Sequence, residues 1–515
     1  MGQRMQYGFA IDQRTCIGCH ACTVACKTEH QVPVGQFRTW VKYVEKGEFP
    51  ATTRDFGVMR CNHCTDAPCI TICPTKALYK RDDGIVDFDG DRCIGCKSCM
   101  QGCPYDAIYI DEDTHTAAKC NFCAHRIDQD LEPACVVVCP THSIWVGDLD
   151  DATSGISRLI NTNPTAVRSP GQNTGPNVFY LGADRAVLAP LDAPVDGAYI
   201  WAASDPHRMD VGKDLTGDPS SGARTTYNTA HPRPWGWRVT SYLWTKAVSA
   251  GVLLVAVLAL FLGIDLGVIG TLVAPALALG FLAVTGLLLV TDLKRPERFL
   301  YIFLKPNPTS WLFWGSVALA AYGAVATIWL ALGLAQEIGS YDASDAFDLL
   351  RWVALPAAAL ATGYTGFLFG QAEGRDLWQS PLLFWHLQVQ ALMVGAGALT
   401  VAVPFVQLDP AGRQLIVRVL VIATAAHVLV LALEYGGRHA TQHAAAAAHM
   451  VTHGRYARLF WTGAVAVALI AALVGAFSWY GEPLIVAIAA GMLVQLALVA
   501  YESVFVRAGQ DVPLS

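Results

Sequence analysis

The pattern of hydrophobic and polar residues divides this chain into two unlike halves. Before residue 240, apolar residues occur in short β-prone runs, such as 84–88 and 107–110, between polar loops. After residue 240, long apolar runs alternate with short polar segments, and each run reaches the roughly 20 residues that a helix needs to cross a bilayer. The eight predicted spans cover residues 242–263, 266–290, 310–334, 349–371, 381–406, 414–435, 458–480 and 483–506.

Composition agrees with this division. Hydrophobic residues make up 53% of the 515 residues, charged residues only 15%, and mean hydropathy is +0.36. These values exclude a disordered chain, and the net charge of -6 argues against a nucleic-acid-binding protein, which would show a basic surface. Buried helices of a soluble core are the alternative to membrane spans, and eight such runs in succession argue against it. Residues 186–240, rich in Pro, Gly, Asp and Ser, are predicted to link the two domains, and residues 507–515 to form a tail.

All 16 cysteines lie in the first half. Residues 1–15 contain neither an apolar signal segment nor a twin-arginine motif, so we expect a cytoplasmic domain whose cysteines bind metal instead of forming disulfides. The cysteines form four groups, spaced C-x2-C-x2-C-x3-C, C-x2-C-x4-C-x3-C, C-x2-C-x2-C-x3-C and C-x2-C-x11-C-x3-C. The groups are Cys16, Cys19, Cys22 and Cys26; Cys61, Cys64, Cys69 and Cys73; Cys93, Cys96, Cys99 and Cys103; and Cys120, Cys123, Cys135 and Cys139.

The spacing of these groups is that of bacterial ferredoxins, which bind [4Fe–4S] clusters. Three thiolates from a tight loop bind one cluster and the fourth binds a neighbouring cluster, so ligands cross between groups. Zinc is the alternative, because C-x2-C pairs also build zinc ribbons, but those sites use two pairs and not a triplet with a distant fourth ligand. The sequence therefore predicts an α+β, ferredoxin-like tandem [4Fe–4S] domain in residues 1–185, with four clusters that carry electrons.

The cysteine groups, with Cys61-Asn62-His63-Cys64 and Ala67-Pro68-Cys69, resemble the four-cluster iron–sulfur subunit of the dimethyl sulfoxide reductase and polysulfide reductase families. The resemblance covers about residues 5–185. It implies that groups one and four share two clusters and that groups two and three share the other two. The implied ligand sets are Cys16, Cys19, Cys22 and Cys139; Cys26, Cys120, Cys123 and Cys135; Cys61, Cys64, Cys69 and Cys103; and Cys73, Cys93, Cys96 and Cys99. His63 and Lys97 lie beside ligands, either to tune them or as ordinary surface residues.

The second half carries a separate resemblance. Residues 291–299 (TDLKRPERF), together with Ser310-Trp311, Trp314-Gly315, Tyr364–Phe367 and Leu433–Gly436, are similar to the membrane subunit of polysulfide reductase, the NrfD-like family. The resemblance covers about residues 235–506. It implies an all-α, eight-helix transmembrane bundle over residues 241–506, exchange of electrons with a quinone near the iron–sulfur domain, and no haem.

Ionisable side chains within the predicted spans are the candidate functional residues, because charge at membrane depth is costly. A quinone needs hydrogen-bond donors and a proton source, and we expect Tyr242, Lys246 and Tyr364 to be the donors. The alternatives are that Lys246 extends to the membrane surface and that Tyr364 caps an interhelical bond.

Further polar residues in the second half suggest a path through the bundle. Arg418, His427 and Glu434 are expected to form a buried polar path, and His386, Asp292 and Arg298 are further candidates for it. The alternative role of Asp292 and Arg298, which we favour, is to brace the loop under the clusters. His386 and His427 could instead be axial ligands of a haem b. Against this alternative, only one such pair exists and the resembled family lacks haem.

Basic residues in the loops predict the orientation. Nine lie on the side of the first domain and two on the opposite side, so the positive-inside rule places the iron–sulfur domain in the cytoplasm, at a bacterial-type inner membrane. The same basic loops can also dock the acidic first domain. The nine are Lys294, Arg295, Arg298, Lys305, Arg375, Arg438, Arg455, Arg458 and Arg507, and the two are Arg351 and Arg413.

The sequence contains no Rossmann glycine fingerprint, nucleophile elbow or open metal site, so a partner must carry the substrate chemistry. The resemblance implies a large catalytic subunit with a molybdenum or tungsten bis-pterin, with a nickel–iron hydrogenase as the second choice. We expect the electron-transfer and anchor subunit of a respiratory oxidoreductase complex that exchanges electrons with menaquinone or ubiquinone. The alternatives are a membrane scaffold without a quinone site and ion translocation coupled to electron flow.

Overall fold

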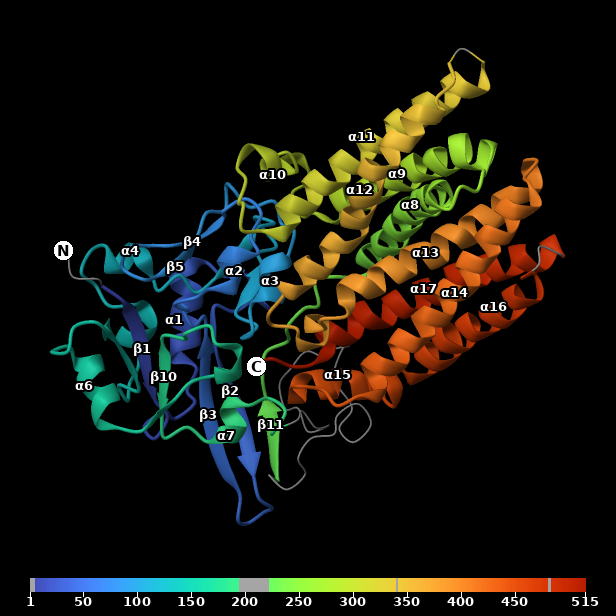
Figure 1. Cartoon of the computed structure of the whole chain (residues 1–515). Coiled ribbons are helices and arrows are strands. Elements are labelled where there is room, and N and C mark those ends of the chain that lie inside the picture. Colours follow the sequence, from blue (N-terminus) through green and yellow to red (C-terminus); the bar gives the residue numbers. More distant parts are fainter. Residues whose placement is uncertain (1–4, 194–221, 340, 480–482) are drawn as a thin grey trace.

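The computed structural model describes residues 5–193, 222–339, 341–479 and 483–515. They form two domains that pack against each other (Figure 1). The first domain, at the left of Figure 1, combines strands with short helices, and the second, at the right, is a bundle of long helices. The predicted fold class, an α+β iron–sulfur domain followed by a helical membrane bundle, is confirmed.

Small sheets and hairpins make up the framework of the first domain. One sheet has the strand order β8-β1-β10-β9, a second has the order β11-β2-β3, and β4-β5 and β6-β7 are two-stranded hairpins at the predicted β-prone runs. The strands are β1 Tyr7–Asp12, β2 Thr39–Lys46, β3 Thr53–Arg60, β4 Leu78–Lys80, β5 Val86–Phe88, β6 Ile108–Ile110, β7 Ala117–Lys119, β8 Ile144–Asp148, β9 Thr165–Ala166, β10 Val178–Leu181 and β11 Ala223–Tyr227.

The helices of the first domain are short, and four of them carry cysteines. Helices α1, α2, α3 and α5 each place one or two thiols toward the domain interior. The helices are α1 Ala21–His30, α2 Pro68–Thr71, α3 Ser98–Gly102, α4 Ala124–Ile127, α5 Ala134–Val137, α6 Gly155–Thr162 and α7 Arg185–Leu188.

Eight helices in the described part of the chain are long and apolar enough to cross a membrane, in agreement with the eight predicted spans. They are α8 Trp237–Phe261, α9 Ala274–Asp292 after a π-helical turn at Ile269–Val273, α11 Trp311–Glu337, α12 Ser344–Gly370, α13 Leu383–Ala402, α14 Pro410–Gly436, α16 Ala466–Phe477 after a π-helical turn at Leu459–Val465, and α17 Leu484–Asp511. Two shorter helices, α10 Tyr301–Leu304 and α15 Gln442–Thr452, lie on the side of the first domain.

Two segments differ from the expected linker and tail. Strand β11 lies within residues 186–240 but pairs with β2, so it completes a sheet of the first domain. Helix α17 continues past residue 506, and the chain after it is held by the first half: Arg168 donates to the Leu514 carbonyl at 2.7 Å and Asn228 to the Ser515 carbonyl at 3.0 Å. The remainder of the expected linker, residues 194–221, lies outside the described residues.

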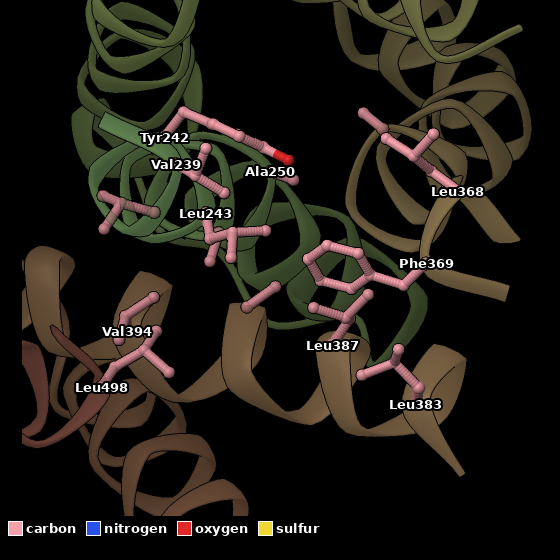
Figure 2. Close-up of a cluster of buried hydrophobic side chains, with 14 of the residues drawn as sticks. Val239, Tyr242, Leu243, Ala250, Leu368, Phe369, Leu383, Leu387, Val394 and Leu498 are labelled. Atoms are coloured by element: carbon pink, nitrogen blue, oxygen red, sulfur yellow. The ribbon is translucent and has the colours of Figure 1, made fainter. Parts of the chain in front are cut away.

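Helix α8 occupies the centre of the bundle, in contact with α9, α12, α13 and α17. The apolar side chains in Figure 2 fill the space between α8, α12, α13 and α17. Gly251 permits the close contact with α13, because a Cβ atom at this position would collide with the Ala391 carbonyl and Gly395. Polar side chains on the buried faces of α8 must therefore find their partners inside the protein.

Candidate functional site

The 16 cysteines all have free thiols, and the fold brings them together in sets of four from distant parts of the chain. Three sets line separate cavities, and in the fourth set three thiols surround Cys26. Each set takes three cysteines from one group and the last cysteine of another. The sets are Cys16, Cys19, Cys22 and Cys139; Cys26, Cys120, Cys123 and Cys135; Cys61, Cys64, Cys69 and Cys103; and Cys73, Cys93, Cys96 and Cys99.

These cysteine sets fit [4Fe–4S] clusters, which need four thiolates around one centre and hydrogen bonds to their sulfurs. The N–H groups of Gly95 and Ala117 lie 3.4 and 3.3 Å from the Cys93 sulfur, and the N–H of Ser143 lies 3.3 Å from the Cys139 sulfur. Burial raises the pKa of the Cys103 thiol to about 12. A positively charged metal centre is what would convert such buried thiols to thiolates.

One cysteine set lies at the boundary with the membrane domain, and we call Cys73, Cys93, Cys96 and Cys99 the membrane-proximal set. The indole N–H of Trp235, just before α8, lies 3.5 Å from the Cys96 carbonyl. At the other extreme, Cys19 is exposed on the surface of the first domain. The sets therefore extend from that surface to the start of α8.

The loop after α9 attaches the two domains beside the membrane-proximal set. Lys97 and Asp292 form an ion pair with 2.7 Å between Nζ and Oδ2. Arg298 donates to the Cys93 carbonyl at 3.1 Å. Asp292 and Arg298 thus contact the loops that carry the cysteines, and neither lies on a path through the bundle.

Within the bundle, the side chain of Lys246 on α8 packs against α12. It lies about 14 Å along α8 from the first residue of that helix, and it is 1% exposed, so it does not extend to the membrane surface. Its ammonium group donates to the Thr362 carbonyl at 2.9 Å and to the Thr365 hydroxyl. The ring of Tyr364 lies 4.6 Å from the same nitrogen. The structure therefore brings together two of the three expected quinone residues.

Two more residues face the region around Lys246. Glu502 on α17 is 2% exposed, interacts with Lys246, and has one carboxylate oxygen without a hydrogen-bond partner in the described part of the chain. Tyr242 lies one turn before Lys246, and its hydroxyl points away from α8 toward the side of α12 (Figure 2). Glu502 is not among the residues predicted from the sequence, although an acidic residue inside a predicted span is the signal that identified Glu434.

A second polar group connects α13 and α14. His386 Nε2 lies 2.9 Å from His427 Nδ1, and His386 Nδ1 lies 3.3 Å from a carboxylate oxygen of Glu434. Glu434 also accepts a hydrogen bond from Ser380 at 2.9 Å, on the side of the first domain. The ring of Tyr501 packs against both histidines. Direct hydrogen bonding leaves no space for an iron between the histidine nitrogens, so this pair does not fit a haem, whereas the line can hold and pass a proton.

Arg418 lies apart from this group. It precedes His427 by nine residues on α14, which corresponds to about 14 Å of helix, and its guanidinium donates to Gln414 at 3.1 Å and packs on the ring of Trp479. The expected path through Arg418, His427 and Glu434 is therefore wrong in its first member, because the rise of the helix separates Arg418 from the other two.

Comparison with known proteins agrees with this geometry. The family model for polysulphide reductase, NrfD, matches residues 225–512, more than half of the chain. The protein belongs to the NrfD polysulphide reductase family. A model for a 4Fe-4S dicluster domain matches residues 53–149, ahead of the NrfD domain.

Three relatives match this protein over about a third of its length. The B subunit of tetrathionate reductase from Salmonella typhimurium is 43% identical over 192 residues, which are 36% of this chain and 77% of the relative. The B component of polysulfide reductase from Wolinella succinogenes is 40% identical over 181 residues, 34% of this chain and 94% of the relative. The arsenate respiratory reductase iron–sulfur subunit of Shewanella sp. is 33% identical over 225 residues, 34% of this chain and 96% of the relative.

These matches establish what the two domains are. The chain joins an iron–sulfur electron-transfer subunit, of the kind found in reductase complexes, to an NrfD membrane domain in one polypeptide. It is a multi-pass membrane protein.

Proposed function

We propose that this NrfD-family chain passes electrons between a quinone in the membrane and a separate catalytic subunit. Each [4Fe–4S] cluster carries one electron at a time, and the four cysteine sets would hold four of them. The observation that carries the proposal is the position of the Lys246 group. Buried ionisable residues lie within α8, α12 and α17, and the start of α8 contacts the membrane-proximal set.

A plain membrane anchor does not need these residues. Charged groups at membrane depth are costly, and they are retained where they bind a ligand or move a charge. In the proposed function, Lys246 and Tyr364 donate hydrogen bonds to a quinone carbonyl. Quinone reduction also takes up two protons, and the line Glu434–His386–His427 offers groups that can hold and transfer them from the side of the first domain.

The names of the relatives support the proposed partner. They are the B or iron–sulfur components of tetrathionate, polysulfide and arsenate reductases, so each belongs to a reductase with other subunits. We infer a catalytic subunit with a molybdenum or tungsten bis-pterin. Metal analysis of the purified complex separates this partner from a nickel–iron hydrogenase, because one contains molybdenum or tungsten and the other nickel.

We also propose that the iron–sulfur domain faces the cytoplasm of a bacterial-type cell. The bias of nine basic residues to two supports this orientation. Part of the bias serves docking, because Arg295, Arg298 and Arg375 bond the first domain. The other six basic residues on that side still outnumber the two on the opposite side, and the proposed orientation rests on them.

The test of quinone chemistry is anaerobic mixing of the oxidised chain, purified with its partner, with a reduced quinone. We expect the iron–sulfur absorbance to bleach, and to bleach much more slowly in Lys246→Met. Arg418→Gln is the matched control, because this half-buried cation lies on another helix, bonded to Gln414. If dithionite bleaches the wild-type clusters but reduced quinone does not, the chain is an anchor without a quinone site.

A further inference from the structure

Two buried cations flank one of the four cysteine sets. Arg60, at the end of β3, and Lys119, at the end of β7, are both 0% exposed. Arg60 contacts the set formed by Cys26, Cys120, Cys123 and Cys135, which we call the doubly flanked set, and Lys119 lies between that set and the neighbouring set that contains Cys69. Surface lysines and arginines are solvated, whereas these two have lost their water and must be stabilised by the protein.

The partners of Arg60 are a sulfur and a ring. One guanidinium nitrogen donates to the Cys135 sulfur at 3.4 Å, and the group lies 4.3 Å from the centre of the Phe9 ring. Its other two nitrogens have no hydrogen-bond partner in the described part of the chain. Lys119 donates to two carbonyl oxygens, those of Val86 and, at 3.0 Å, Cys120.

Neither cation has a carboxylate partner among the ion pairs of the described residues. A buried charge without a counter-charge is strongly unfavourable. The sources of negative charge beside them are cysteine sets, because four thiolates around a [4Fe–4S] core carry a net negative charge when the cluster is bound. Arg60 contacts the doubly flanked set, and Lys119 lies between that set and the set of Cys69. The two cations therefore gain counter-charges when clusters are bound.

The doubly flanked set also receives a third side-chain contact. His30 Nε2 lies 3.2 Å from the Cys123 sulfur. At the membrane-proximal set, by contrast, the buried cation Lys97 is neutralised by Asp292 at 2.7 Å, and the hydrogen bonds to Cys93 come from backbone N–H groups. Arg60 and Lys119 thus bring two cations without a carboxylate partner to the doubly flanked set, whereas the cation at the membrane-proximal set is paired with a carboxylate.

We propose that the cluster of the doubly flanked set has the highest reduction potential in the chain, and that Arg60 and Lys119 set it. Reduction adds one electron to a cluster and makes it more negative. A fixed cation in a low-dielectric interior stabilises the reduced form more than the oxidised form, and hydrogen bonds to the sulfurs act in the same direction. Electrons in transit therefore rest at this cluster, between the surface and the membrane-proximal set.

Redox titration followed by electron paramagnetic resonance tests this on the full chain with its partner. Cys123→Ser identifies the signal of the doubly flanked cluster, because it removes one of its ligands. In wild type we expect that signal to have the highest midpoint potential. Arg60→Met and Lys119→Met are each expected to shift this signal to lower potential. The matched control is Arg126→Met, because Arg126 lies on α4 nearby but is partly exposed and paired with Glu29.

The inference rests on the proposed occupancy of the four sets, and iron analysis keeps the two claims apart. An iron content in the wild-type chain that is too low for four clusters would overturn the proposed cofactors. If Arg60→Met has full iron content and unchanged potentials, the inference is overturned. It is also overturned if another cluster has the highest midpoint potential in the wild-type protein. If Arg60→Met does not accumulate, Arg60→Lys keeps the charge and is expected to keep the potential close to wild type, whereas a large downward shift there would contradict the charge argument.

Discussion

Lys97 and Asp292 form an ion pair across the domain boundary, with 2.7 Å between their charged atoms and side chains that are 7% and 15% exposed. Lys97 follows Cys96 of the membrane-proximal set, and Asp292 ends α9 of the bundle. The pair therefore fixes a cysteine loop to a membrane helix at the point where the two proposed electron-carrying sites meet. A shift at this pair would change the separation between those sites.

Asp292→Asn is expected to weaken docking of the two domains. The change leaves Lys97 buried without a counter-charge, and breaking such a pair costs about 3 kcal/mol. We expect a lower midpoint of thermal unfolding for the first domain and faster proteolysis of the interdomain segment. Glu297→Gln is the control, because its partner Arg295 is 31% exposed and Glu297 is 58% exposed. Equal stability of Asp292→Asn and wild type would mean that the other loop contacts suffice.

Lys246→Ala and Tyr364→Phe are each expected to lower quinone-linked turnover about 100-fold, the usual effect of losing a donor to a developing negative charge. Activity of the partner with an artificial dye should stay at the wild-type level, and iron content should not change, because neither residue is a cluster ligand. Steady-state rates with quinone and with dye measure the two effects. Normal quinone turnover in both variants would place the quinone site elsewhere.

Glu434→Gln is expected to slow quinone turnover while leaving dye-linked activity intact. The amide can still accept the hydrogen bond from Ser380 and lie against His386, but it can no longer take up a proton. His449→Ala, on α15, is the control, because this histidine is only half-buried and lies outside the line. If Glu434→Gln turns over as fast as wild type at every pH, protons reach the quinone by another route.

Metal analysis of the anaerobically purified chain is expected to find about 16 iron atoms and no zinc, since each [4Fe–4S] cluster takes four cysteines. Cys123→Ser should lower the iron content without releasing all of it, because the four sets are separate. Twelve irons or fewer in wild type, or one zinc for each cysteine set, would refute the count of four clusters.

Orientation can be tested with epitope tags inserted one at a time after Gly263 and after Gly437, two exposed positions at opposite ends of the bundle. We expect antibody to reach the Gly263 tag in intact spheroplasts and the Gly437 tag only after permeabilisation. A fusion after Ser515 is less suitable, because this residue is buried at the domain boundary. The reverse accessibility would mean that the charge bias reflects docking alone.

Local sequence signals predicted most of this molecule. Cysteine spacing and the length of apolar runs are patterns of residues that lie close together in the sequence. Both the ligand groups and the eight helices follow from these local patterns. The pairing of β11 with β2 depends on contacts between residues about 180 positions apart, and the short run Ala223–Tyr227 gives no strong periodic signal. The contacts after the end of α17 join residues that are 287 and 346 positions apart.

The candidate site was predictable only in part. Lys246 and Tyr364 were found because charge and polarity inside an apolar run are conspicuous, and Glu502 was missed although it carries the same signal. Arg60 and Lys119 lie in a charged region of the sequence, where a lysine or arginine normally faces water, so their complete burial depends on tertiary packing. For the same reason, the sequence left open whether His63 is a surface residue or lies against the ligands; the structure buries it, at 0% exposed.

The contacts of Leu514 and Ser515 with the first half have a consequence for biogenesis. These residues are translated after all eight membrane helices, yet they complete the boundary that Arg168 and Asn228 begin. At about 5–20 residues per second, synthesis of the membrane half takes on the order of 15–60 s. During that interval the first domain is already outside the ribosome and lacks its final contacts. The interval is a window in which iron–sulfur assembly factors can reach the cysteine loops that the finished protein encloses.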